Sequence, residues 1–365
     1  MTSLSAERIR DELKRIAAPD GRGNIVTAGL VSEIAINGGE VMFALNASPQ
    51  HMKAMEQLRD VVEKAVKAIP GVTRALVVLT AEKQQGQAAP AAPAKAGAVP
   101  GVKHIIAVAS GKGGVGKSTT AINVALGLAT LGLKVGVLDA DIYGPSMPKL
   151  FGLSGKPLAS DKQGMRMKPM SRYGLEVASI GFLIEEDTPM IWRGPMVMSA
   201  LTQLLREVAW SETDVMVIDM PPGTGDAQLT LAQQTPLSGA VIVSTPQDLA
   251  LIDARKGINM FNKVNVPLLG IVENMSYFLC TTCGTRHEIF GHGGARAEAE
   301  KLGVPFLGEV PLDMELRQRS DSGEPIVATN PSSPHTAIYR KMAEQIWATL
   351  ESGSAIRKAP KIVFE

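Results

Sequence analysis

Short apolar runs alternate with helical patterns in the second part of the chain, from about residue 103 onward. The apolar runs are residues 105–109, 135–138, 215–218, 240–243 and 268–272. Strands that are apolar on both faces are typical of a parallel sheet covered by helices. A helical pattern from 118 to about 131 follows the first run, and Ser333 with Pro334 begins a C-terminal helix that reaches about residue 350. This part of the chain is therefore expected to form an α/β domain with a doubly wound, mostly parallel sheet.

The first part of the chain has a different pattern, which predicts a small α/β domain. Two stretches, 6–16 and 52–68, are amphipathic at helical spacing. Three strands are expected at 29–36, 40–45 and 73–79, with the first two joined by the turn-forming Asn37-Gly38-Gly39. The expected order of elements is α-β-β-α-β.

Residues 84–101 separate these two regions. Their sequence, QQGQAAPAAPAKAGAVPG, cannot supply a packed core and suits a semi-extended linker. The residues from 356 to 365 resemble a surface tail. We therefore expect a small domain over 1–83, a linker over 84–101, a main domain over 102–355 and a tail over 356–365.

Composition and charge indicate a multi-domain protein with a substantial core and no dominant charge. The chain has 365 residues, of which 45% are hydrophobic, and 37 Lys and Arg against 36 Asp and Glu. This balance does not favour nucleic acid or an anionic membrane as a partner. No apolar run approaches the roughly 18 residues of a membrane span, and the first residues lack the apolar core of a signal peptide. We expect a cytoplasmic protein that binds neither a membrane nor nucleic acid.

One segment fits the phosphate-binding pattern G-x-x-x-x-G-K-[ST] at every fixed position. It stands between an apolar run and a helical run, which is the strand–loop–helix order of a P-loop. Glycines let backbone N–H groups turn toward an anion, and a helix N-terminus favours phosphate. We expect Lys117 to reach the β- and γ-phosphates of a nucleotide, and the Ser118 hydroxyl to reach Mg²⁺. The expected binding residues are Gly111, Lys112, Gly113, Gly114, Val115, Gly116, Lys117, Ser118 and Thr119.

Polar residues follow three other apolar runs, at the strand ends where doubly wound sheets bind their ligands. Asp139 and Asp141 follow one run, and a strand-end cap is the alternative role for Asp139. Asp219 follows another, in the place of a Walker B carboxylate that supports Mg²⁺ through its water shell. Asn274 follows a third, and its amide has the donor and acceptor that match an adenine edge, with an Asx turn as the alternative.

Cys280 and Cys283 are the only cysteines in the chain. Their C-x-x-C spacing suits two ligands of one metal or cluster, but zinc and iron–sulfur centres ordinarily have four ligands. The other two could be His287 and His292 of the same chain, giving a zinc site, or the cysteines of a second chain, giving four thiolates at a two-fold axis. A redox pair and a pair of inert thiols are further alternatives.

Together these motifs resemble a known family. Lys112 inside K-G-G-V-G-K-S resembles the deviant Walker A motif of the ParA/MinD-like NTPases. Within residues 103–330, the ordered motifs DADIYGPS, WRGPM, IDMPPGTGD, VSTPQ, DARKG, ENMSYFLCTTC and IFGHGG are similar to those of the Mrp/ApbC iron–sulfur cluster carriers.

The resemblance implies a homodimer that binds ATP, hydrolyses it slowly and carries a [4Fe–4S] cluster. It implies that Lys112 reaches the nucleotide of the other subunit and that Asp141 orients the attacking water. Asn274 would contact the adenine, and paired Cys280 and Cys283 would hold the cluster. The implied partners are a cluster donor and apo-proteins that receive the cluster.

The first region resembles the small domain at the front of many iron–sulfur assembly proteins. It has no cysteine, and Ala18-Pro19-Asp20 stands where that family commonly has an acidic residue before the proline. We therefore expect a docking or dimer-supporting module rather than a second metal site. Two other functions are considered for the whole chain: a ParA/MinD-type positioning ATPase that acts on DNA or membrane, and a zinc-stabilised NTPase without a cluster.

Overall fold

The computed structural model describes residues 5–19, 23–37, 39–47, 52–81, 97–161, 165–183 and 194–353. Five features expected from the sequence lie wholly or partly outside these residues: Asp20, Gly38 of the Asn37-Gly38-Gly39 turn, residues 84–96 of the linker, residues 192–193 of the WRGPM motif, and the tail. The chain divides into two compact units, one of residues 1–92 with 187–200 and the other of residues 93–186 with 201–365. Where the functional domains begin and end remains a prediction.

The first unit has the expected α-β-β-α-β order. Its elements are α1 (Ala6–Leu13), β1 (Ala35–Asn37), β2 (Glu40–Ala47), α2 (Met52–Lys67) and β3 (Arg74–Ala81). Strand β2 pairs with β1 in the antiparallel direction and with β3 in the parallel direction. The apolar faces of both helices and of the sheet enclose a core that includes Ile9, Phe43, Val62 and Val77.

The first strand of this unit is much shorter than the prediction of 29–36. The Asn24 side chain accepts hydrogen bonds from the backbone N–H groups of Val26 (3.1 Å) and Thr27 (2.8 Å) and so forms a turn. Gly29 follows with φ of +69°, and Val31 makes a single bridge to Leu45. Backbone hydrogen bonds from Ser32 to Ala44 (2.9 Å) and from Asn46 to Leu30 (2.7 Å) still join this stretch to β2. The Ser32 hydroxyl also accepts from the N–H of Ala44 (2.8 Å), in place of a backbone carbonyl, so the regular ladder begins only at β1.

An eight-stranded sheet forms the centre of the second unit, in the order β13-β10-β9-β4-β8-β5-β7-β6. All neighbours are parallel except β6 and β7, which confirms a mostly parallel sheet. The strands are β4 (Val102–Ala109), β5 (Val135–Asp139), β6 (Met170–Arg172), β7 (Leu175–Ser179), β8 (Thr213–Asp219), β9 (Gly239–Ser244), β10 (Leu268–Asn274) and β13 (Phe306–Val310).

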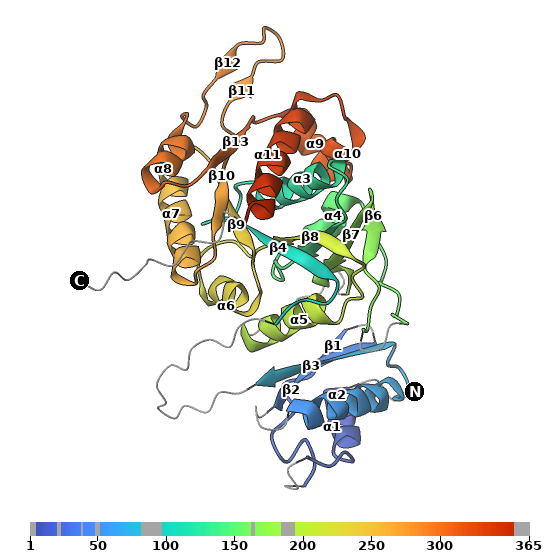
Figure 1. Cartoon of the computed structure of the whole chain (residues 1–365). Helices are drawn as coiled ribbons and strands as arrows, with labels where there is room; N and C mark the ends of the chain where they lie inside the picture. The colour runs from blue at the N-terminus through green and yellow to red at the C-terminus, as the bar shows by residue number, and fades with distance from the viewer. Residues whose placement is uncertain are drawn as a thin grey trace, which may run out of the picture. The chain divides into compact units, whose positions relative to one another are not determined.

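Helices cover both faces of this sheet, as expected for a doubly wound fold (Figure 1). Alternation along β9 shows the two faces: Val241 and Val243 belong to the core under α3 and α11, while Ile242 faces α7 near Gly257. The helices of this unit are α3 (Lys117–Thr130), α4 (Met147–Phe151), α6 (Asp226–Gln234), α7 (Asp248–Lys263), α8 (Gly294–Leu302), α9 (Met314–Ser322), α10 (Ile326–Thr329) and α11 (Pro334–Glu351), with a 3₁₀ turn at Ile180–Phe182. Helix α5 (Gly194–Arg206) contains residues of both units.

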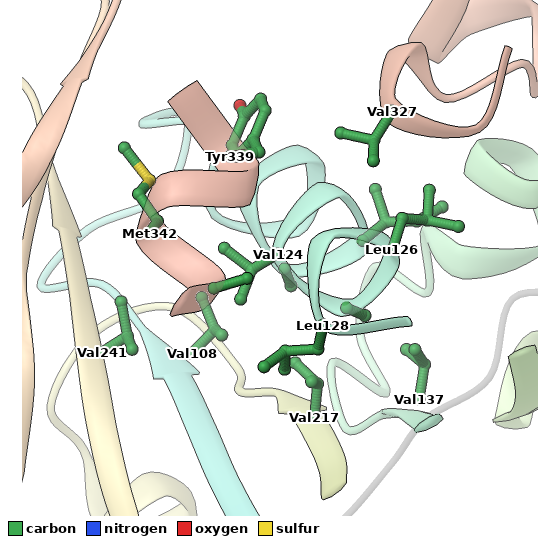
Figure 2. Close-up of a cluster of buried hydrophobic side chains, with 14 of the residues drawn as sticks. Val108, Val124, Leu126, Leu128, Val137, Val217, Val241, Val327, Tyr339 and Met342 are labelled. Atoms are coloured by element: carbon green, nitrogen blue, oxygen red, sulfur yellow. The ribbon is translucent and has the colours of Figure 1, made fainter. Parts of the chain in front are cut away.

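The core between α3, α11 and the sheet holds the helix that follows the P-loop. Helix α11 begins as predicted, because the Ser333 side chain accepts a hydrogen bond from the N–H of His335 (3.2 Å). Gly127 lets α3 approach α11 closely, since a Cβ at this position would lie 2.9 Å from the carbonyl oxygen of Tyr339. Figure 2 shows the side chains that fill this core, among them Val108, Val124, Leu128, Val217, Val241, Tyr339 and Met342.

Candidate functional site

The P-loop connects β4 to α3 and depends on glycine at two kinds of position. Gly114 and Gly116 have φ of +79° and +80°, the left-handed region that favours glycine. Gly111 packs against the backbone of α7, where an added Cβ would lie 2.2 Å from the carbonyl group of Asp253. The Ser110 hydroxyl donates to the carbonyl oxygen of Lys112 (2.8 Å). The loop is therefore shaped from both ends and held against a neighbouring helix.

Lys117 and Asp219 form a buried ion pair at the base of this loop. The Lys117 Nζ atom lies 2.5 Å from Asp219 Oδ1 and 3.3 Å from the Ser118 hydroxyl. Burial raises the pKa of Asp219, and the positive charge of Lys117 opposes that shift. The other carboxylate oxygen, Oδ2, is buried with no hydrogen-bond partner among the described residues. An unpartnered carboxylate oxygen near the Ser118 hydroxyl is an oxygen donor set that fits Mg²⁺ and its water shell.

Asp139 holds the loop that follows β5. Its Oδ2 accepts hydrogen bonds from the N–H groups of Ser146 and Met147 (3.0 Å each) and from the Ser179 hydroxyl (2.9 Å), and its Oδ1 accepts from the N–H of Asp141 (3.2 Å). These contacts support the strand-end cap as its role. Burial, with the nearby negative charge of Asp219, raises the pKa of Asp139 to about 7.

Asp141 lies in that loop beside the ion pair. Its Oδ1 accepts a hydrogen bond from the N–H of Gly144 (3.3 Å). Burial raises the pKa of Asp141, and the charges of Lys117 and Asp219 act on it in opposite directions. The fold thus brings Lys117, Asp141 and Asp219, from three different strand ends, close enough for their charges to act on one another.

The segment after β8 is tied to the start of the P-loop. The N–H of Gly223 donates to the carbonyl oxygen of Ser110 (3.0 Å). The Gln228 side-chain amide of α6 donates to the carbonyl oxygen of Pro222. The turn over 221–226 therefore lies against the loop that is expected to hold the phosphates.

Asn274 contacts the P-loop itself, a relationship that the sequence did not predict. Its Nδ2 atom donates to the carbonyl oxygen of Val115 (2.8 Å), and the side chain is buried. A Cβ on Gly116 would lie 2.1 Å from the same nitrogen. Asn274 thus fastens the loop to the end of β10, and its expected contact with adenine stays a prediction.

The cysteines lie in a two-stranded hairpin of β11 (Phe278–Leu279) and β12 (Arg286–His287) that projects from the second unit (Figure 1). The N–H of Cys280 donates to the carbonyl oxygen of Thr285 (2.9 Å). Cys280 is half-buried and Cys283 is exposed. A hydrogen bond with the Thr285 hydroxyl, at 3.1 Å from Sγ, holds the pKa of the Cys283 thiol below its usual range. The thiolate is the form that binds metals, so these two cysteines are the candidate metal ligands of this segment.

The two histidines lie in the same segment but have other neighbours. His292 Nδ1 is 2.9 Å from the Arg286 guanidinium, and His287 pairs with Phe278 across the hairpin. Among the residues that the structure describes, no group of three or more His, Cys, Asp or Glu side chains is arranged to hold a metal ion.

Arg286 fastens the hairpin to the body of the unit. Its guanidinium lies over the Tyr277 ring, 3.9 Å from the ring centroid, and 3.2 Å from a carboxylate oxygen of Glu309 on β13. Glu309 also pairs with Arg296 of α8 at 3.3 Å.

The described helices include none that is both long and apolar enough to cross a membrane.

Two family models match the chain. The model of the NUBPL iron-transfer P-loop NTPase matches residues 101–347, and a model of iron–sulfur cluster assembly proteins matches residues 6–77. The iron–sulfur cluster carrier protein of Synechocystis is 44% identical over 94% of this chain and 97% of its own length. The carrier protein of Escherichia coli K12 is 56% identical over 68% of each chain.

Solved structures agree with this relationship. The nucleotide-binding protein of Archaeoglobus fulgidus, in complex with ADP, is 41% identical with a TM-score of 0.57, over 66% of this chain and 93% of its own. The cell division ATPase MinD of Pyrococcus furiosus, 21% identical with a TM-score of 0.51 over 67% of this chain and 98% of its own, shares the fold. The chain therefore belongs to the iron–sulfur cluster carrier family of ParA/MinD-like P-loop NTPases.

Proposed function

We propose that this protein binds and slowly hydrolyses ATP with Mg²⁺ and carries a [4Fe–4S] cluster between the cysteine hairpins of a homodimer. The cluster is cargo that the dimer receives from a donor and delivers to apo-proteins. The observation that carries the proposal is the placement of an accessible C-x-x-C pair on a fixed hairpin of the unit that holds the P-loop. Membership of the carrier family supports it.

The residues of the nucleotide site have separate roles in this proposal. The backbone N–H groups over 111–119 bind the phosphates, and Lys117 leaves its contact with Asp219 to neutralise the β- and γ-phosphates. Ser118 and the unpartnered Oδ2 of Asp219 hold Mg²⁺ and its water shell, and Mg²⁺ supplies charge neutralisation on the phosphates. The Asn274 amide, whose Nδ2 holds the P-loop, also lies at the adenine.

Hydrolysis requires a water aligned with the γ-phosphorus. Asp141 accepts a hydrogen bond from this water, whose oxygen bonds to phosphorus as the bond to the β–γ bridging oxygen breaks. The products are ADP and phosphate, and one proton leaves to solvent. Lys112 neutralises charge on the nucleotide of the partner copy, so hydrolysis depends on dimerisation. The hydrogen bond from Gly223 to Ser110 lets the 221–226 turn respond to the same phosphate.

The number of thiolate ligands in one chain indicates how the cluster is held. One chain supplies the two thiolates of Cys280 and Cys283, and a cubane cluster takes four. A two-fold axis between two hairpins provides the other two. The small first unit is a docking or dimer-supporting module, because it matches the assembly-protein model and has no cysteine. Its boundary at 83, the linker and the cytoplasmic location remain predictions.

Anaerobic reconstitution with iron and sulfide, followed by ultraviolet–visible and Mössbauer spectra, tests this proposal. Wild-type protein is expected to show the signature of a [4Fe–4S] cluster, and Cys280→Ala or Cys283→Ala to lose it. The matched control is the double variant His287→Ala/His292→Ala, which changes the same segment and is expected to keep the cluster. Stoichiometric zinc without iron–sulfur absorption, lost in the histidine variant, would replace the proposal by a zinc-stabilised NTPase.

A further inference from the structure

Strand β10 ends in a sharp corner that leads into the cysteine hairpin. The corner consists of Glu273, Asn274, Met275 and Ser276, of which Met275 has φ of +54°, a strained conformation for a residue other than glycine. Glu273 and Ser276 are fully buried, and Asn274 is 6% exposed. The surrounding contacts must therefore hold this corner in place.

The Glu273 carboxylate holds both ends of the segment that carries the cysteines. Its Oε1 accepts from the Ser276 hydroxyl (2.6 Å), where the segment begins, and from the N–H of Gly293 (3.2 Å), where it ends. Its Oε2 accepts from the N–H of Ala295 (2.8 Å) in the first turn of α8. One buried carboxylate thus closes the base of the segment and compensates the N-terminal dipole of the next helix.

The neighbouring Asn274 points to the other face of the sheet, because side chains alternate along a strand. On that face its Nδ2 holds the carbonyl oxygen of Val115 in the P-loop at 2.8 Å. A displacement of the loop when phosphate binds therefore acts on Asn274. Glu273, one peptide bond away, holds the hairpin base.

A second set of contacts connects the P-loop to the base of the cysteine hairpin. Gly111 of the P-loop packs on the α7 backbone at Asp253, and two residues later Arg255 forms a bidentate ion pair with Glu298 of α8 (2.5 and 2.7 Å). Glu298 is 5% exposed. Helix α8 begins at the N–H groups that Glu273 binds. The P-loop and the hairpin base are thus joined through packed backbone and hydrogen bonds on both paths.

We propose that Glu273 is a positioning residue. It makes the arrangement of residues 276–293, the segment that contains the cysteine hairpin, depend on the nucleotide at the P-loop. This inference rests on the proposed function for the identity of the two ligands. The coupling itself is reciprocal: nucleotide alters the hairpin, and a cluster on the hairpin alters nucleotide affinity by the same factor. Glu273 touches neither ligand and acts through Ser276, Gly293 and Asn274.

Backbone hydrogen exchange of the full chain, without nucleotide and with Mg²⁺ and a non-hydrolysable ATP analogue, tests this inference without any iron–sulfur cluster. In wild type, nucleotide is expected to change exchange rates within 276–293 by at least about fivefold. Glu273→Gln keeps the shape of the side chain and removes its charge, so this nucleotide-dependent difference should fall below about twofold. Nucleotide affinity should stay within about a factor of two.

Glu309→Gln is the matched control, because Glu309 stands directly beside Glu273 in the pairing of β13 with β10, while its carboxylate pairs with Arg286 and Arg296 rather than with Ser276, Gly293 or Ala295. It is expected to keep the wild-type response to nucleotide. Ser276→Ala removes one of the three hydrogen bonds of Glu273 and should weaken the response partially. This variant keeps the inference testable if Glu273→Gln does not fold.

A merely structural role for Glu273 would change absolute exchange rates and leave the nucleotide-dependent difference intact. That result, or a wild-type hairpin that ignores bound nucleotide, would overturn the inference. Both outcomes differ from a failure of the proposed function, which would appear as nucleotide binding with normal coupling but no iron–sulfur cluster after reconstitution.

Discussion

The ammonium of Lys117 lies 2.5 Å from a carboxylate oxygen of Asp219, and both side chains are buried. The lysine expected to neutralise the nucleotide phosphates therefore also neutralises a carboxylate expected to support Mg²⁺. In the proposed mechanism, binding of nucleotide with Mg²⁺ would replace this ion pair by two contacts, one between Lys117 and the phosphates and one between Asp219 and the hydrated cation.

Lys117→Ala should weaken ATP binding and abolish hydrolysis. The lost charge-assisted hydrogen bond corresponds to roughly a 10- to 100-fold rise in Kd. Isothermal titration with Mg·ATP and a phosphate-release assay measure the two effects. Wild-type affinity and turnover in this variant would contradict the assignment of the P-loop lysine.

Removing Lys117 should also destabilise the protein without nucleotide, since it leaves Asp219 buried and uncompensated. The expected loss in the free energy of unfolding is about 3 kcal/mol. In the double variant Lys117→Ala/Asp219→Asn no uncompensated charge remains, so part of this loss should be recovered. Urea unfolding of the two single variants and the double variant gives the coupling energy, and simple additivity would mean that the pair is not formed in solution.

Lys112→Ala should leave ATP binding largely intact and reduce hydrolysis. The reason is that its proposed target is the nucleotide of the partner copy. Turnover per chain is expected to rise with protein concentration in wild type and to rise much less in the variant. Equal turnover of the two proteins across the concentration range would argue against a role across the dimer.

Gly127→Ala tests the packing of α3 on α11. Alanine favours a helix interior by about 1 kcal/mol, but its Cβ would lie 2.9 Å from the Tyr339 carbonyl oxygen and 3.0 Å from the Ala343 Cβ. Overpacking of this kind costs about 1–3 kcal/mol, so the variant should be less stable. The comparison variant is Ala348→Gly at an exposed site of α11, where only the helix propensity changes. A more stable Gly127→Ala protein would show that relieving the contact costs less than the roughly 1 kcal/mol gained in helix propensity.

Asp139 should give the stability a pH dependence near neutrality. Its pKa is raised from 3.8 to about 7 in the folded protein, so the folded state favours the protonated form. Its favourable contribution is complete below about pH 4 and is lost as the pH rises through 7, at up to about 1.4 kcal/mol per unit of pKa difference. Asp139→Asn is expected to be less stable than wild type, because its amide faces backbone N–H donors. The amide does not titrate, so this deficit should be largest near pH 4 and smaller at pH 8. Unfolding curves from pH 4 to 8 should lose this slope in the variant, and an unchanged slope would place the titration elsewhere.

The fold was predictable where buried strands are continuous apolar runs, as for β4, β5, β8, β9 and β10. Strands β6, β7 and β13 did not stand out, because each carries half-buried positions and β6 is only three residues long. The P-loop was predictable because its chemistry lies in consecutive residues. The contact of Asn274 with Val115, 159 residues away in the chain, depends on tertiary packing and carries no local signal.

The role of Glu273 also depends on tertiary contacts that the sequence does not show. A glutamate at a strand end is compatible with a cap, a ligand or a solvated charge, and only the fold brings Ser276, Gly293 and Ala295 to it. The prediction for the first strand was wrong because a side chain interrupts the pairing: the Ser32 hydroxyl accepts from the N–H of Ala44 in place of a backbone carbonyl, which the apolar pattern does not show.

The iron content of reconstituted protein, measured together with its mass in solution, tests the central claim most directly. If two chains share one [4Fe–4S] cluster through Cys280 and Cys283, wild-type protein should be a dimer with about two iron and two sulfide per chain. Cys280→Ala protein should contain neither. A reconstituted monomer with a full cluster, or a dimer that keeps its cluster without these cysteines, would contradict the account.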